Sequence, residues 1–201
     1  GVQQTRYITV DSQSAADLAF NNMEVAASAR LGDGDGDGDG DGDSSTAIAA
    51  LADLALFTLC AEALGSMEQA VALTVDYTRN RQQFGMPLAR FQVLQHRMVD
   101  MQTHVEQARS LVYLTASLID TGDSEAQAQG STSRTQAVAA MQVLVLEAAR
   151  YVSQQAVQLH GGMGVTDEMA ISHHFKRLLA TGLRCGTAAQ HLDRYAGLTA
   201  A

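Results

Sequence analysis

Two segments of the sequence combine residue types that could bind a phosphorylated ligand. The first is RNRQQFG at residues 79–85, which places guanidinium groups at Arg79 and Arg81 close to the ring of Phe84. A guanidinium binds phosphate oxygens through two parallel hydrogen bonds, and an aromatic ring offers a flat apolar surface beside them. The same arginines would also suit the C-terminal end of a helix, where positive charge interacts favourably with the helix dipole. The residues alone leave both interpretations open.

The second segment is the glycine-rich QLHGGMGV at residues 158–165. Because glycine has no side chain, a ligand can approach its backbone closely. The alternative is a glycine that ends a helix in an ordinary turn, which explains one glycine well and three glycines within four residues less well. His160 is notable for its place beside this loop rather than for its imidazole.

Other catalytic patterns are not found in the sequence, and no metal site is predicted. Asp100 and His104 are four residues apart, which is typical of an ordinary contact on a helix surface. His173 and His174 are adjacent and should point in different directions. Neither a Glu-x-x-His metal pair nor a Gly-x-Ser-x-Gly nucleophile motif occurs.

The composition favours a globular cytoplasmic protein. The chain has 201 residues, of which 46% are hydrophobic and 17% charged, and a net charge of -9, which argues against a nucleic-acid-binding protein. Cys60 and Cys185 are too few for a disulfide framework or a zinc site and suit a reducing compartment. Residues 47–61 are apolar, but Asp53 and Glu62 interrupt the run, so a buried helix is expected rather than a membrane span.

The hydrophobic pattern predicts a mainly α fold: an up-and-down four-helix bundle preceded by a short β segment. Strands are expected within residues 7–10 and 16–20, and helices at about 44–80, 91–119, 133–159, 168–180 and 187–196. The expected core face of the first helix is Ile48, Leu51, Leu54, Ala55, Thr58, Leu59, Ala63 and Met67. The expected domains are the end of a β-domain (1–31), a linker (32–43) and the helical bundle (44–201).

The linker, residues 32–43, alternates glycine with six aspartates. These residues cannot bury side chains and repel one another, so a linker is expected. A calcium loop is the alternative, but an EF-hand needs a glutamate at its twelfth position, and none stands there.

The segments resemble, in order, the C-terminal half of the flavin-dependent acyl-CoA dehydrogenase family. RQQFG, FQVLQH and VDM are similar to one signature of that family, and QLHGGMGVTDE with HHFKRL is the most specific match. The resemblance covers nearly the whole chain and is strongest to the bacterial branch labelled pimeloyl-CoA dehydrogenase small subunit. It implies that the family's N-terminal helical domain and most of its middle β-domain precede this sequence.

The resemblance implies FAD as cofactor, with two groups of contacts. Arg81 matches the arginine that pairs with the FAD pyrophosphate. The positions that match further contacts to the cofactor of a neighbouring subunit are Gln83, Phe84, Gln92, Gln158, Gly161 and Gly162. Thr187 matches a threonine beside the flavin ring of its own subunit.

The sequence departs from the family at the catalytic base. In the family a glutamate that removes the α-proton usually precedes a Gly-Thr pair, but Cys185 precedes the pair at 186–187. Some relatives carry the base at the position of Ala55, which is not acidic. Asp53 is a weak alternative, because it faces a different side of the helix from Ala55, and Glu62 is a weaker one, because it lies two turns further along.

Three hypotheses follow. The chain is an acyl-CoA dehydrogenase subunit whose larger partner supplies the glutamate, or a self-sufficient dehydrogenase with another base, or a helical assembly module without flavin. The first two imply an acyl-CoA substrate, an electron-transfer flavoprotein as acceptor and a homo- or hetero-oligomer.

Overall fold

A computed structural model describes residues 1–29, 44–120, 132–184 and 186–199 of the chain. Its large elements are α1 (Ser44–Asn80), α2 (Gln92–Asp120), α4 (Thr132–His160), α5 (Ala170–Arg184) and α6 (Ala188–Thr199), preceded by strands β1 (Val2–Ile8) and β2 (Ser14–Phe20). The expected Gly-Asp linker and Cys185 lie outside the described residues.

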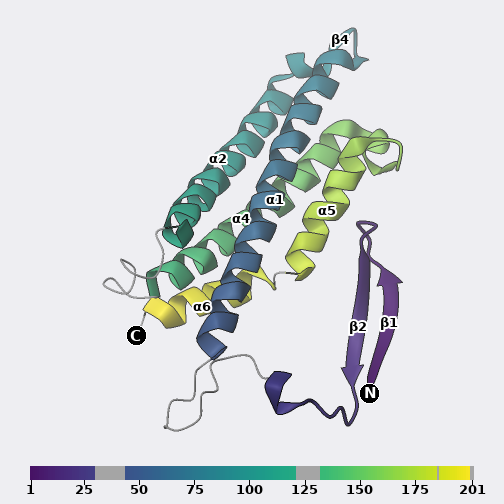
Figure 1. The fold of residues 1–201 in the computed structure, drawn as a ribbon. Helices are drawn as coiled ribbons and strands as arrows, with labels where there is room; N and C mark the ends of the chain where they lie inside the picture. The colour runs from purple at the N-terminus through teal and green to yellow at the C-terminus, as the bar shows by residue number, and fades with distance from the viewer. Residues whose placement is uncertain (30–43, 121–131, 185, 200–201) are drawn as a thin grey trace.

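The four long helices form the predicted up-and-down bundle. Figure 1 shows α1 and α4 running in one direction and α2 and α5 returning beside them. α6 crosses the end of the bundle where α1 begins and packs against α4. Short connections at the other end join α1 to α2 and α4 to α5.

The core lies between the four long helices. Its largest fully buried apolar side chains are Met67, Val105, Met101, Val138, Met141, Val145, Val152 and Ile171. The methionines suit this place because their flexible thioethers fill irregular gaps between helices.

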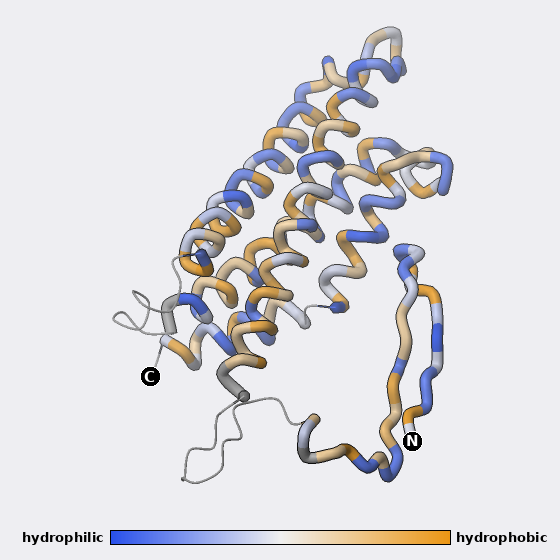
Figure 2. The backbone as a smooth tube through the Cα atoms, viewed as in Figure 1, coloured by the Kyte–Doolittle hydropathy of each residue, from blue (hydrophilic) through white to orange (hydrophobic). Residues whose placement is uncertain are grey.

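The expected core face of α1 is only partly correct. Ala63 and Met67 are buried, but Ile48, Leu51 and Leu54 are exposed. Figure 2 shows apolar residues along most of the first half of α1, so the sequence pattern there has no clear polar side to set its orientation. The face that packs inward continues along the second half of the helix.

By length and composition alone, α1 could also cross a membrane. Residues 47–80 contain the required apolar stretch, and only 22% of its most apolar window is buried. A single helix of this kind is weak support for a membrane span, because core helices of globular proteins pass the same test.

The β segment is an antiparallel hairpin. Val2 pairs with Phe20 and Ile8 with Ser14, so β1 begins earlier than the sequence predicted and Val10 belongs to the turn. Residues 3–6 were not predicted as strand, because their polar side chains lack the apolar alternation of a half-buried strand. The turn of the hairpin lies beside α5 in Figure 1.

Candidate functional site

The arginine-rich segment lies where α1 turns into α2. The backbone N–H of Arg81 donates to the Tyr77 carbonyl at 2.8 Å, and the Arg81 carbonyl accepts from the Leu88 N–H at 2.9 Å. The strands β3 (Gln82–Gln83) and β4 (Met86–Pro87) pair between them. The side chains of Arg81 and Gln83 are exposed at this end of the bundle.

Phe84 stands in an unusual conformation at the tip of this small hairpin. Phe84 and Gly85 form its two-residue loop with φ of 56° and 81°, the left-handed pair that such tight hairpins require. For a non-glycine residue this conformation costs roughly 1–2 kcal/mol. The ring is 84% exposed and touches Phe91 only edge-on, with ring centroids 6.0 Å apart. Packing within the described chain therefore does not explain an aromatic residue here, and the ring is free to contact another molecule.

The glycine-rich segment follows the end of α4 directly. Gly161 has φ of 62°, which suits the residue that ends a helix. A Cβ on Gly164 would lie 2.7 Å from the Val157 carbonyl oxygen, so packing requires a glycine there. Gly162 has neither reason: its φ is ordinary, and a Cβ would meet no atom within 4 Å. The fold thus accounts for two glycines and leaves the third open to close approach from outside.

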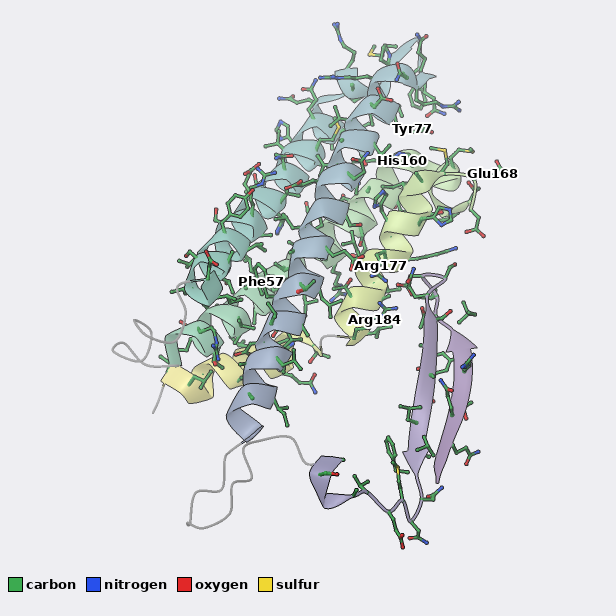
Figure 3. All side chains as sticks on the ribbon, viewed as in Figure 1. Phe57, Tyr77, His160, Glu168, Arg177 and Arg184 are labelled. Atoms are coloured by element: carbon green, nitrogen blue, oxygen red, sulfur yellow. The ribbon has the colours of Figure 1, made fainter. Side chains whose placement is uncertain are left out.

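Tyr77 and His160 bring these two segments together. Their rings stack with centroids 4.4 Å apart and an interplanar angle of 25°, and the Tyr77 hydroxyl donates to the His160 carbonyl at 3.3 Å. Figure 3 shows the two residues side by side toward the end of the bundle that carries both segments. Burial, opposed by a hydrogen bond with the Ala156 carbonyl, lowers the pKa of His160. The imidazole is therefore a buried packing element, which the sequence did not suggest.

The sequence-predicted residues fall into two regions. Seven of them lie at the end joined by Tyr77 and His160: Arg81, Gln83, Phe84, Gln92, Gln158, Gly161 and Gly162. Thr187 lies beyond the far end of α5, a helix of 15 residues. That helix is about 22 Å long at a rise of about 1.5 Å per residue.

Thr187 caps the first turn of α6. Its hydroxyl accepts from the Gln190 N–H at 3.2 Å, and its own N–H donates to the Gln190 side chain at 2.8 Å. This reciprocal pair is a capping box, and the sequence Thr-Ala-Ala-Gln could have predicted it.

A groove of about 320 Å³ runs beside Thr187 between α4, α5 and the start of α6. Apolar side chains from α4 and α5 form part of its wall, and Glu147 and Arg150 of α4 add opposite charges. This groove could not be predicted from the sequence, because its walls come from three separate helices.

Asp53 is buried at the opposite end of the bundle. Its carboxylate is 2% exposed and accepts from Arg194 of α6 at 2.8 Å and from Thr135 of α4 at 3.1 Å. Asp53 does not face solvent, because α4 and α6 close over it. A base must reach its substrate, so this environment favours a structural role for Asp53.

Glu62 belongs to an ion-pair cluster between the bundle and the β hairpin. The Arg177 guanidinium makes two contacts of 2.7 Å with the Glu62 carboxylate and also pairs with Asp11 in the hairpin turn. Arg184 approaches Asp11 at 3.3 Å, and Figure 3 shows both arginines along α5. Burial raises the pKa of Asp11, but hydrogen bonds from Thr9 and Arg177 outweigh it and keep that pKa below its ordinary value. The cluster fixes the hairpin turn against α1 and α5.

The two positions that the resemblance predicts for the catalytic base, 55 and 185, are alanine and cysteine and offer no carboxylate. Ala55 is exposed on α1, and Cys185 lies outside the described part of the chain. Within the described ranges, no three histidine, cysteine or acidic side chains converge as metal ligands. His104 contacts the Tyr151 ring at 4.3 Å, and His174 contacts Ser66 at 2.9 Å.

Comparison with known proteins identifies the family. Residues 47–196 match the family described as "Acyl-CoA dehydrogenase, C-terminal domain". The chain belongs to the acyl-CoA dehydrogenase family, whose members are FAD-dependent flavoproteins. The resemblance of the quoted motifs to this family is thereby confirmed.

Individual relatives agree with this assignment. Acyl-CoA dehydrogenase IpdE2 of Mycolicibacterium smegmatis is 35% identical over 144 residues, which cover 72% of this chain and 42% of that protein. The ChsE4-ChsE5 complex of Mycobacterium tuberculosis matches with a TM-score of 0.82 and 26% identity over 100% of this chain and 49% of that one. Butyryl-CoA dehydrogenase of Megasphaera elsdenii matches with a TM-score of 0.81 and 26% identity over the same shares. The chain thus spans about half or less of the length of these relatives.

Proposed function

We propose that this chain supplies the helical domain of an FAD-dependent acyl-CoA dehydrogenase. The observation that carries the proposal is the convergence of the ends of α1 and α4 through Tyr77 and His160. The exposed Arg81, the exposed ring of Phe84 and the uncovered backbone at Gly162 suit the pyrophosphate and adenosine parts of a dinucleotide.

Bound FAD would accept the β-hydride of an acyl-CoA thioester while a carboxylate takes the α-proton, which leaves an α,β-unsaturated thioester. The residues of this chain bind and orient. Arg81 neutralises phosphate charge through its planar guanidinium. Gln83, Gln92 and Gln158 offer hydrogen bonds, and Phe84 offers an apolar wall. Gly161 and Gly162 let the backbone approach the cofactor.

The separation of the two regions supports an oligomer. Thr187 lies beyond the far end of α5 from the other residues, so the two regions would serve different cofactors in one protomer. An arrangement in which Arg81 and Gly162 reach a neighbouring subunit's FAD, while Thr187 lies beside its own, satisfies this geometry. The solved structure of a relative is described as the ChsE4-ChsE5 complex, which supports the proposal that this chain also assembles with a further chain.

The chain would lack its own catalytic glutamate and depend on a homologous partner for it. Ala55 offers no carboxylate, and Asp53 and Glu62 are both engaged in ion pairs. A thiol at position 185 is a poor substitute, because a thiol with an ordinary pKa of about 8.5 is mostly protonated at neutral pH.

The substrate would be an acyl-CoA, and the acceptor an electron-transfer flavoprotein. The cysteine content and the family's fold support a cytoplasmic location.

Cofactor binding is tested by comparing two arginines of the same turn. Arg81→Ala should weaken FAD binding about tenfold to a hundredfold, because a charge-assisted hydrogen bond is lost. Arg79→Ala is the matched control, since Arg79 is exposed and lines a groove between α1 and α2 instead. FAD is titrated into the deflavinated full-length protein, and quenching of flavin fluorescence gives Kd. Equal affinities for the two variants, or a full-length protein that never takes up FAD, would contradict the proposal.

Dependence on a partner is tested by activity. The full-length protein alone should dehydrogenate acyl-CoA poorly, and addition of a homologous larger subunit should restore turnover. Rapid turnover by the isolated protein would refute the missing base.

A further inference from the structure

Tyr77 contacts both segments of the candidate cofactor site through different atoms. Its backbone carbonyl accepts from the Arg81 N–H at 2.8 Å. Its hydroxyl donates to the His160 carbonyl at 3.3 Å, and its ring stacks on the imidazole. One residue thus links the start of the Arg81 segment to the residue before Gly161.

His160 is itself held firmly on the α4 side. The side chain is 4% exposed, and its Nδ1 lies 2.8 Å from the Ala156 carbonyl oxygen. A carbonyl can only accept, so Nδ1 carries the proton and donates. Because Gly164 has no side chain, the glycine-rich loop packs tightly against His160. A Cβ on Gly164 would lie only 3.0 Å from the His160 Cβ. Tyr77 therefore contacts a residue that is itself packed against the glycine-rich loop.

We propose that Tyr77 is a positioning residue for the dinucleotide site, which fixes the spacing between the Arg81 guanidinium and the Gly161–Gly162 backbone without touching the cofactor. The inference rests on the proposed function. A ligand that bridges two segments binds most tightly when they are already at the correct spacing, because less freedom is lost on binding. The ring stack fixes the orientation of the ends of α1 and α4 relative to each other, and the hydrogen bond fixes their relative position along the helix axes.

A role in packing alone makes a different prediction. A residue that only fills space would lower the stability of the bundle without changing the affinity of molecules that remain folded. Val112 is a suitable comparison, because it is buried in the core on α2 and 4% exposed. Val112→Ala should destabilise the bundle through a cavity and leave FAD affinity within about twofold of the unchanged protein.

The test measures FAD Kd in the full-length protein at a temperature at which every variant is folded. Tyr77→Leu removes both the stack and the hydrogen bond and should weaken FAD binding about tenfold. Tyr77→Phe keeps the ring and should weaken binding about two- to fivefold, since only the hydrogen bond is lost. If Tyr77→Leu fails to fold, the conservative Tyr77→Phe still decides. Tyr77 variants with the affinity of Val112→Ala would overturn the inference.

Two further variants separate this inference from the proposed function. Arg81→Ala and Gly162→Val alter the proposed contacts themselves, and the open space at Gly162 allows the larger side chain to fit. If both weaken FAD binding and the Tyr77 variants do not, the positioning role fails and the cofactor site stands. If neither weakens it, the cofactor site fails, and the role of Tyr77 with it.

Discussion

At the scale of single residues, the clearest functional signs are features that the fold does not need. Phe84 adopts a left-handed backbone and exposes its ring, and Gly162 lacks a packing reason to be glycine. By contrast, Gly164 and Thr187 have complete local explanations in packing and helix capping. Residues without a local structural explanation are therefore better candidates for cofactor contacts than residues chosen by type alone.

Phe84 provides a prediction about strain. Phe84→Gly and Phe84→Ala both remove the ring, so both should weaken FAD binding in the full-length protein. Glycine tolerates the left-handed conformation, so Phe84→Gly should be more stable than Phe84→Ala by about 1 kcal/mol. Urea unfolding measures the difference, and equal stabilities would show that the turn relaxes.

The residue types predicted the arginine-rich segment and the glycine-rich segment as candidate cofactor contacts. They did not predict the Tyr77–His160 contact that joins the two segments. Tyr77 stands one turn before Arg81 in the sequence, and only the packing of α1 against α4 reveals its contact with His160. No local pattern specifies which residue of another helix a side chain will meet.

At the scale of elements, the ion pairs of Asp53 and Asp11 hold the smaller parts of the structure to the bundle. Asp53 joins α1 to α4 and α6, and Asp11 joins the hairpin turn to α5. Each carboxylate is almost fully buried and contacts arginine side chains. Such pairs are costly to break from one side, because a charge is left without its partner.

Asp53→Asn tests this structural role. The substitution should lower the free energy of unfolding toward the lower end of roughly 3–5 kcal/mol, because Arg194 remains partly exposed. Asp193→Asn, on the exposed residue beside Arg194, is the matched control and should change little. Urea unfolding measures both variants. If Asp53→Asn instead abolished turnover without lowering stability, Asp53 would be the base after all.

Helix existence could be predicted from the sequence far better than helix faces. The first three long helices begin and end within one or two residues of expectation, because each has a long apolar pattern. α5 runs on to Arg184 where an end near Ala180 was expected, since burial of Thr181 outweighs the low helix propensity of Gly182. The apolar first half of α1 offered no polar side from which to choose its inward face.

At the scale of the whole molecule, much apolar surface is exposed. Large side chains such as Val2, Ile8 and Phe20 on the hairpin and Leu51 on α1 are more than half exposed. A two-stranded hairpin alone is marginally stable in water. The exposed apolar side chains therefore favour a structure in which further parts of the protein, or a partner, cover them.

One buried histidine, His160, and one half-buried histidine, His174, predict how global stability depends on pH. Burial lowers the pKa values of His160 and His174 from an ordinary value of 6.5. Below about pH 6.5 the unfolded chain binds protons that the folded chain does not, so the free energy of unfolding should fall as pH drops, by at most about 1.4 kcal/mol per pH unit for each histidine. Above about pH 6.5 both histidines are mostly neutral in the folded and in the unfolded chain, so they should add little further dependence of stability on pH.

The measurement is urea unfolding at several pH values between 5.5 and 7.5. His174→Gln keeps a polar group beside Ser66 and should reduce the slope, whereas His96→Gln, on the exposed surface of α2, should leave it unchanged. Stability that increases on acidification would contradict the assignment.

The length of α5 sets the distance between the two regions of the proposed cofactor contacts. This helix alone spans from the glycine loop to the turn that carries Thr187. One inserted or deleted residue would rotate everything beyond it by about 100° and shift it by about 1.5 Å. Thr187 would then be misplaced relative to the glycine loop, and two neighbouring protomers could no longer complete each other's cofactor pockets.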